Sequence, residues 1–145
     1  CIRSSWVHSN YGENFFLTMK RLFLNNEIVQ VVNDQYGIPT TTNFLVNITN
    51  QIINLKNEGK ELPKILHACP SGNASWYDFA LFINQCMENH KKIKCKKIIG
   101  IDSSQYPLLA KRPAYSVLSN KKLINLINLK VNNWFKEHKE LYKEN

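Results

Sequence analysis

The sequence predicts an α/β fold, and three observations support this prediction. Four short apolar or β-branched runs have the length and composition of strands: residues 1–7, 28–32, 65–68 and 98–101. Longer segments between them repeat apolar residues every three to four positions, as on one face of a helix. The two kinds of segment alternate along the chain, which is typical of α/β proteins.

The first half of the chain is expected to contain two strands and two helices. Residues 1–7 predict a short buried strand, and residues 14–23 an amphipathic helix. A strand over residues 28–32 is followed by a loop whose glycine and proline indicate sharp turns. Thr41 or Thr42 can then cap a second helix, which keeps its apolar spacing to about residue 55.

The second half continues the alternation. After the strand at residues 65–68, Ser75 and Asp78 have the spacing of a capping box, which opens a helix to about residue 89. Ser119 or Asn120 can cap a further helix, and residues 134–142 form a terminal one. No repeat, low-complexity segment or internal boundary interrupts the chain, so residues 1–145 are expected to form a single unit.

Composition narrows the classes of function. The chain is 43% hydrophobic and 21% charged, which is ordinary for a soluble protein, and its net charge of +8 attracts anionic ligands in general. Nucleic-acid binding is disfavoured because only three of the 19 basic residues are arginines and no basic run alternates with aromatic residues. The densest lysine cluster, at residues 91–97, is interpreted as a solvated face.

Cysteine usage and hydropathy favour a cytoplasmic protein. The four cysteines form no CxxC pair and show no Cys/His spacing of a zinc site, so we expect reduced thiols and no metal. No apolar run approaches the ~20 residues of a membrane span, so no membrane partner is expected. His90 and His138 lie among lysines and give no indication of a site.

The loop over residues 106–118 has the most distinctive local chemistry. Pro113 pushes Arg112 toward an extended conformation, and an extended guanidinium on a stiffened loop suits phosphate oxygens. A surface connector, whose arginine pairs with a nearby carboxylate, is an equally good interpretation of the local chemistry.

Four blocks of the chain resemble one known family, the dTDP-4-dehydrorhamnose reductases of the extended short-chain dehydrogenase/reductase superfamily. The blocks occur in the family's order and cover nearly the whole chain. They are RSSWVHS at residues 3–9, VVNDQYGIPT at 31–40, LHAC with SWYDFA at 66–69 and 75–80, and YPLLAKRPAYSVL at 106–118. They match only the C-terminal half of such an enzyme.

The resemblance implies the C-terminal portion of an NAD(P)-binding Rossmann-like fold, without the N-terminal dinucleotide-binding half. The full-length enzymes hold NADPH on a glycine-rich turn, and none of the five glycines of this chain forms that motif. No tyrosine has a lysine four residues later, so the superfamily's catalytic pair is missing too. We therefore expect no catalytic residue, no NADPH binding and no activity from this chain alone.

The resemblance also implies five substrate-binding residues. Trp6 would lie beside the sugar ring, Asn14 would offer its amide, Gln35 and Thr40 would line the same cleft, and Arg112 would bind the diphosphate. Each has a structural alternative: a core position for Trp6, a capping role for Asn14, a purely structural turn for Gln35 and Thr40, and the surface connector described above for Arg112.

The remaining residues of the matched blocks are expected to be structural. Trp76 and Phe79 fall on the inner face of a capped helix, which predicts the core, and His67 is interpreted as a structural strand residue. Lys111 is expected to face solvent. His8 stands where the family often has tyrosine.

Two functions follow from the resemblance. The first is the nucleotide-sugar-binding part of a reductase that converts dTDP-4-dehydro-L-rhamnose to dTDP-L-rhamnose with NADPH, for cell-surface polysaccharide. Its expected partners are the dTDP-sugar and either the missing half or further copies of this chain. The alternative is a non-catalytic binding or regulatory module derived from the same fold.

Overall fold

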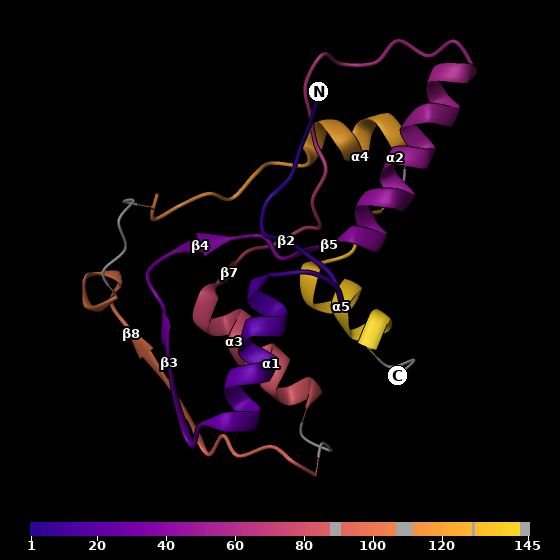
Figure 1. Cartoon of the computed structure of the whole chain (residues 1–145). Helices are drawn as coiled ribbons and strands as arrows, with labels where there is room; N and C mark the ends of the chain where they lie inside the picture. The colour runs from indigo at the N-terminus through magenta and orange to yellow at the C-terminus, as the bar shows by residue number, and fades with distance from the viewer. Residues whose placement is uncertain (88–90, 107–111, 129, 143–145) are drawn as a thin grey trace.

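The computed structural model describes residues 1–87, 91–106, 112–128 and 130–142, with side chains described up to residue 139. Strands and helices alternate along the chain, as predicted (Figure 1). In chain order they are β1 (Ile2–Arg3), β2 (Val7–His8), α1 (Phe15–Asn25), β3 (Ile28–Val32), β4 (Tyr36–Gly37), β5 (Thr40–Thr41), α2 (Thr42–Asn57), β6 (Leu66–His67), β7 (Ala74–Ser75), α3 (Trp76–Cys86), β8 (Lys97–Ile101), the short 3-10 helix η1 (Ser103–Gln105), α4 (Lys121–Ile127) and α5 (Trp134–Tyr142).

The described strands pair two by two, and most pairs are parallel. β1 pairs with β6, β2 with β5 and β3 with β8, all in parallel, whereas β4 and β7 are antiparallel. The longest ladder places Ile28 opposite Lys97 and ends with Val32 opposite Ile101. Because helices lie between the paired strands in the sequence, these are crossover connections, and the α/β prediction is confirmed.

The expected strand over residues 1–7 is wrong in two respects. Trp6 has φ +44°, in the left-handed region that interrupts an extended chain, so β1 and β2 are separate elements. Burial also differs, because Ile2 is 42% exposed and Arg3 is exposed. Sequence pattern could not reveal either point, since the break depends on how the Trp6 indole packs.

Side-chain caps begin the three longest helices of the described chain. The Asn14 side chain accepts from Leu17 N–H at the start of α1, and Thr41 accepts from Phe44 N–H at the start of α2. At α3 the Ser75 hydroxyl accepts from Asp78 N–H, while the Asp78 carboxylate accepts from Ser75 N–H. The predicted capping box is therefore confirmed, and each cap satisfies an amide that the helix leaves unpaired.

The cap of α4 differs from the prediction. Asn120 occupies the N-cap position, but its side chain makes no capping hydrogen bond. Its amide instead donates to the Cys69 carbonyl oxygen and the Ser71 hydroxyl. Asn120 thus ties the start of α4 to the segment that follows β6.

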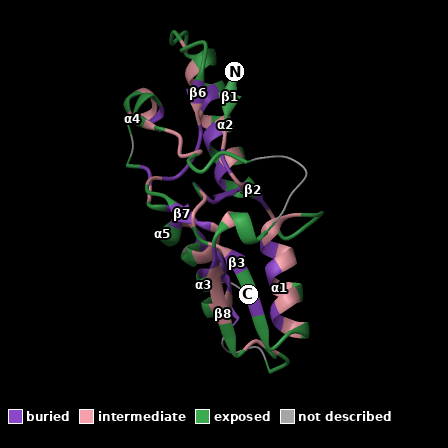
Figure 2. Ribbon diagram, turned by 90° about the vertical axis from the view of Figure 1, so that its left-hand side faces the viewer, coloured by how far each residue is buried: buried purple, intermediate pink, exposed green. Residues whose placement is uncertain are grey.

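Buried residues form two hydrophobic clusters along the long axis of the molecule. One cluster packs α1, α3, β3 and α5 together, around Phe23, Phe79 and Ile83. The other packs α2 and α4 against β6, around Leu66 and Leu123. Figure 2 shows α1, α3 and β3 toward one end of the view and α2, α4 and β6 toward the other, with β2 and α5 between them. The parallel pairing of β2 with β5 connects the two ends.

The lengths and composition of the helices can be compared with those of a membrane span. None of those in the described ranges is long and apolar enough to cross a membrane.

Candidate functional site

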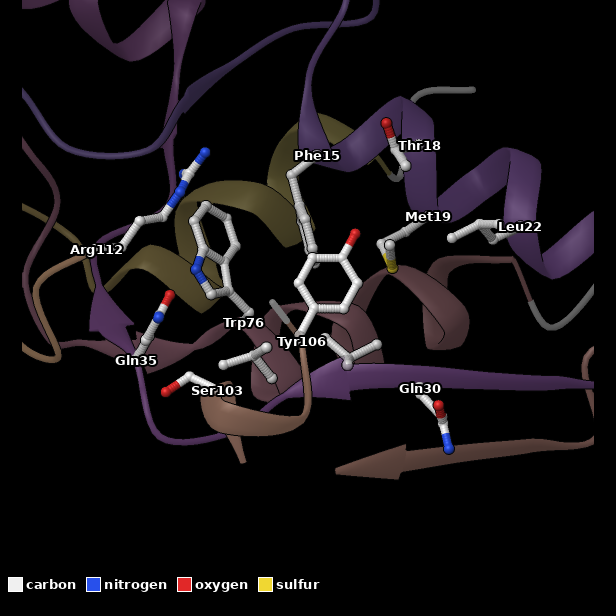
Figure 3. A pocket seen from close by; sticks show the side chains of 12 residues that line it. Phe15, Thr18, Met19, Leu22, Gln30, Gln35, Trp76, Ser103, Tyr106 and Arg112 are labelled. Atoms are coloured by element: carbon white, nitrogen blue, oxygen red, sulfur yellow. The ribbon is translucent and has the colours of Figure 1, made fainter. Parts of the chain in front are cut away.

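Two adjoining cavities open where β3, α1, α3 and the Arg112 segment meet. The larger has a volume of about 430 Å³ and a mostly apolar wall, and the smaller has a volume of about 200 Å³. Gln35, Trp76 and Arg112 line both cavities, so the two adjoin and are described together as one cleft. We refer to this region as the Arg112 cleft (Figure 3).

Arg112 places a cation at the junction of the two cavities. Its side chain is exposed, and it forms no ion pair with any carboxylate in the described part of the chain. The surface-connector alternative required such a pair. Figure 3 shows the guanidinium beside the Trp76 indole, with Gln35 nearby. Within the described residues, the guanidinium at this junction is therefore free of any carboxylate partner.

A tryptophan stack forms the wall of the smaller cavity. The Trp6 and Trp76 rings lie 3.5 Å apart between centroids, with an interplanar angle of 8°. Gly37 packs so closely against Trp6 that an added Cβ would come within 2.2 Å of the indole Cε2. Trp76 and Gly37 both pack against the Trp6 indole, so only part of the ring is left to line the smaller cavity.

The larger cavity takes its apolar wall from α1 and its rim from η1. Phe15, Met19 and Leu22 contribute from the helix, and Ser103 and Tyr106 from η1 and its end. Figure 3 shows the Tyr106 ring beside Phe15, on the opposite side of Trp76 from Arg112.

Asp34 fixes the rim of the larger cavity. Its carboxylate accepts hydrogen bonds from the Ser103 amide at 3.1 Å and from the Ser103 hydroxyl at 2.7 Å. Because Asp34 follows β3 and Ser103 follows β8, the two bonds tie together the ends of the longest strand pair. They thereby set the position of η1.

The cleft brings together three of the five residues expected to bind substrate. Trp6, Gln35 and Arg112 line it, whereas Asn14 and Thr40 do not. The Asn14 amide donates to the carbonyl oxygens of Ser9 and Tyr11 while its oxygen caps α1, which is the capping alternative. Thr40 is fully buried, and its hydroxyl donates to the Ile38 carbonyl oxygen. Its amide donates to the Trp6 carbonyl oxygen.

Sequence reasoning missed Trp76 and Tyr106 as wall residues. Phe79 is buried as expected, but Trp76 is only half-buried, and its ring faces the cleft. One signal was present in the sequence: Trp76 follows the N-cap Ser75, and the first turn of a helix after a strand is a common place for ligand contacts. Tyr106 opened the proline-containing loop but was given no role of its own.

Two buried histidines are linked to each other and to the carbonyl oxygen of Trp6. His8 Nδ1 is 3.0 Å from the Trp6 carbonyl oxygen, and His8 Nε2 is 2.9 Å from His138 Nε2. Burial lowers the pKa of both imidazoles, and at His138 burial together with repulsion from His8 lowers it to about 3. The interpretation of His138 as an uninformative residue among lysines is therefore wrong, because helix periodicity turns it inward. His90 lies outside the described residues, as does Lys111.

The glycines of the chain do not form a cradle for a dinucleotide. Side chains already fill the space beside three of them: Trp6 at Gly37, Asn133 at Gly72 and Asn33 at Gly100. The space beside Gly12 and Gly59 is open, but neither belongs to a glycine-rich turn between a strand and a helix. The residues present therefore do not fit a pyrophosphate-binding loop for NADPH.

The chain is similar to one family over its whole length. A profile of the RmlD substrate binding domain matches residues 1–145. The dTDP-4-dehydrorhamnose reductase of Escherichia coli strain K12 is 31% identical over 133 residues, which cover 91% of this chain and 44% of the relative. The spore coat polysaccharide biosynthesis protein SpsK of Bacillus subtilis is 34% identical over 143 residues, or 99% of this chain and 46% of the relative.

Solved structures of proteins with the same reductase name are also similar to this chain. A dTDP-4-dehydrorhamnose reductase from Clostridium acetobutylicum superposes with a TM-score of 0.81 at 32% identity, covering 99% of this chain and 47% of that one. The reductase from Bacillus anthracis in complex with NADP gives a TM-score of 0.78 at 29% identity. The match covers 99% of this chain and 48% of that structure.

The fold and the cleft define the ligand-binding portion of a Rossmann-like α/β enzyme, in this case the C-terminal part of an extended short-chain dehydrogenase/reductase fold. The chain belongs to the RmlD substrate binding domain family and matches the substrate-binding portion of dTDP-4-dehydrorhamnose reductases. The family resemblance inferred from the four blocks is thereby confirmed. The chain spans less than half the length of these relatives.

Proposed function

We propose that this chain is the nucleotide-sugar-binding unit of a dTDP-4-dehydrorhamnose reductase, and that it binds its ligand in the Arg112 cleft. One observation carries the proposal: an exposed arginine, with no ion-pair partner among the described residues, lies where an apolar cavity and a tryptophan-lined cavity join. A nucleoside diphosphate sugar has a matching layout, with an anionic centre between two ring systems.

The two cavities suit the two ends of such a ligand. The diphosphate lies at Arg112, whose planar guanidinium can donate two parallel hydrogen bonds to phosphate oxygens. The sugar occupies the smaller cavity beside Trp6 and Gln35. The base and deoxyribose occupy the larger cavity, where the Tyr106 ring and the apolar side chains of α1 offer a surface for stacking.

The reaction of the whole enzyme follows from this role. The complete protein reduces the C4 carbonyl of dTDP-4-dehydro-L-rhamnose, and NADPH supplies the hydride. The dinucleotide site and the proton donor belong to another segment, because the residues described here form neither. Residues 1–145 act as one cytoplasmic substrate-binding unit, which works beside that segment or within an oligomer.

Calorimetric titration of the chain with dTDP and dTDP-rhamnose tests the proposal. Both should bind, and Arg112→Ala should weaken binding because it removes a charge-assisted contact worth roughly 1.5–3 kcal/mol. That range corresponds to about 10- to 150-fold in the dissociation constant. Arg21→Ala is the matched control, since Arg21 is exposed on α1 and does not line the cleft.

Two results decide between the proposal and its rival. Equal losses of affinity in the two arginine variants would show that Arg112 contributes only through the overall charge of the chain, and would contradict the proposed site. Absence of nucleotide binding, together with a stable protein partner, would instead favour the non-catalytic regulatory module.

A further inference from the structure

The His8–His138 pair contains more hydrogen-bonded contacts than two neutral imidazoles have protons. His138 Nδ1 lies 2.6 Å from the Trp134 carbonyl oxygen, His8 Nδ1 lies 3.0 Å from the Trp6 carbonyl oxygen, and the two Nε2 atoms lie 2.9 Å apart. Each of these three contacts needs one proton. A neutral imidazole carries one N–H, so the neutral pair supplies two.

The distances indicate which of the three contacts must contain a proton. At 2.6 Å, the Nδ1 lone pair of His138 would repel the Trp134 carbonyl oxygen strongly, so this nitrogen carries a proton. The second proton then serves either the Nε2–Nε2 contact or the Trp6 carbonyl. In the neutral pair, one of these two places two lone pairs about 3 Å apart.

We propose that the pair takes up one additional proton, and that this proton closes all three contacts and thereby makes His8 and His138 positioning residues for Trp6. With three protons, His138 donates to the Trp134 carbonyl, one proton bridges the Nε2 atoms, and His8 donates to the Trp6 carbonyl. The pair then carries a single positive charge.

The proton acts on the Arg112 cleft through the backbone of Trp6. The Trp6 carbonyl already accepts from Thr40 N–H, and His8 supplies the second donor to the same oxygen. Trp6 holds φ +44°, a conformation that a bulky side chain adopts only where its surroundings impose it. The second hydrogen bond fixes that conformation and with it the stack on Trp76.

The surroundings allow one proton but oppose a second. Uncharged rings contact the imidazoles from three elements: Phe16 on α1, Phe79 and Phe82 on α3, and Trp134 on α5. The charged groups with described side chains on the same helices are engaged elsewhere or exposed: Lys20 lies over the Phe16 ring, Asp78 is in the α3 cap, Glu137 is bonded to Asn132, and Arg21, Lys136 and Lys139 are exposed. Burial places the proton uptake below the ordinary pKa of 6.5, and repulsion between the rings lowers the pKa of a second uptake further.

Nitrogen-15 NMR of the histidine rings in the full chain counts the protons directly. As the pH falls from about 7.5 to about 4.5, below the ordinary pKa, the pair should gain one proton, and His8 Nδ1 should be protonated at the end point. His138→Gln supplies a permanent amide donor in place of the bridging proton. In this variant His8 should remain the neutral Nδ1–H form throughout.

Binding of dTDP-rhamnose measures the effect on the cleft, and this part rests on the proposed function. Its esterified diphosphate has no ionisation near pH 6, so a pH effect reports on the protein. Affinity should rise about 2- to 12-fold as the pair gains its proton, which is the range for one hydrogen bond. It should be independent of pH in His138→Gln and in His8→Gln, which keeps the bridge but loses the Trp6 contact.

The NMR titration and the binding measurement test separate parts of the proposal. Two neutral Nδ1–H rings at every pH at which the wild-type chain is folded would overturn the proton inference, whatever the ligand does. The same pH dependence of affinity in wild type and His138→Gln would overturn the coupling to Trp6. Failure of dTDP-rhamnose to bind at any pH would contradict the proposed function while leaving the NMR result valid.

Discussion

Gly37 determines how closely the backbone can approach the Trp6 indole. A Cβ at this position would lie 2.2 Å from Cε2 of the ring, far inside the contact distance. We expect Gly37→Ala to displace the Trp6 indole, to disturb its stack on Trp76, and to lower the free energy of unfolding by about 1–3 kcal/mol, the usual cost of overpacking. Near-ultraviolet circular dichroism reports on the stack, and urea denaturation reports on the stability.

Gly100→Ala is the matched control for this substitution. Its added Cβ meets the Asn33 side-chain amide at 2.9 Å, and this flexible end can move. The control should lose less stability and should keep the aromatic circular dichroism signal. An undisturbed signal in Gly37→Ala would contradict the close packing of glycine on indole.

The buried histidines make stability depend on pH, with a definite sign. Their pKa values are lowered in the folded chain, that of His138 from 6.5 to about 3, so the unfolded chain binds more protons below 6.5. Their contribution to stability is complete above about pH 6.5 and is lost as the pH falls toward the folded value. Urea denaturation at a series of pH values should show this decline.

His138→Gln should flatten the pH dependence of stability. It removes one titrating group, so the slope should decrease by up to about 1.4 kcal/mol per pH unit over the window below pH 6.5. An unchanged slope at pH values where the folded wild-type pair has not yet taken up its proton would mean that His138 titrates alike in the folded and unfolded chains. This readout does not involve a ligand.

At the scale of elements, the capping box of α3 controls the cleft. Ser75 and Asp78 exchange hydrogen bonds across the first turn, and Trp76 is the first residue of that helix. Ser75→Ala should therefore lower the free energy of unfolding by about 0.5–2 kcal/mol. It should also disturb the tryptophan stack, which makes fluorescence a second measurement.

Substitutions at Asp78 separate the cap from general effects of mutation. Asp78→Ala should resemble Ser75→Ala, whereas Asp78→Glu should remain close to wild type, because glutamate is common at this position of a capping box. Asp78 is exposed, so the longer side chain has room. Equal stabilities for all three variants would show that the box contributes nothing measurable.

At the scale of the whole molecule, exposed apolar residues predict self-association. Val46 and Ile53 lie seven positions apart on α2 and are 56% and 50% exposed. Ile2, at the edge of the β1–β6 pair, is 42% exposed. Apolar surface and an unpaired strand edge both promote contact between chains. Analytical ultracentrifugation of the isolated chain should therefore detect dimers or larger species.

Lysine substitutions locate the surface that drives this association. Val46→Lys with Ile53→Lys should shift the chain toward monomer. Leu81→Lys on α3, where the residue is 42% exposed, is a single-site control and should have a smaller effect. A wild-type chain that sediments as a monomer at high concentration would refute the prediction.

Local sequence predicted most elements because their signals are local. Thr41, Ser75 and the apolar spacing of the helices act within one or two turns of the chain, and the structure has the helices that they indicate. The break at Trp6 had no such signal, since its backbone conformation depends on Gly37 and Trp76, 31 and 70 positions away. Asn120 shows the same limit, because its partners Cys69 and Ser71 lie in another segment.

The cleft was predictable in part, for the same reason. The proline beside Arg112 and its membership of a matched block made the residue a candidate without knowledge of its neighbours. Asn14 and Thr40 belonged to matched blocks as well, yet their polar atoms are engaged within the protein. Trp76 and Tyr106 could be recognised only once α3 and η1 had been brought to the same cavity.

The sequence by itself determined the family, the alternation of strands and helices, and Arg112 as the candidate cation for an anionic ligand, because each is written in consecutive residues. Tertiary structure alone decided which tryptophan meets which, and which side chains border the cleft. It also decided that His8 and His138, 130 positions apart, lie within hydrogen-bonding distance. These contacts depend on the packing of α3 and α5 against β2, and no short stretch of sequence encodes a distance between elements.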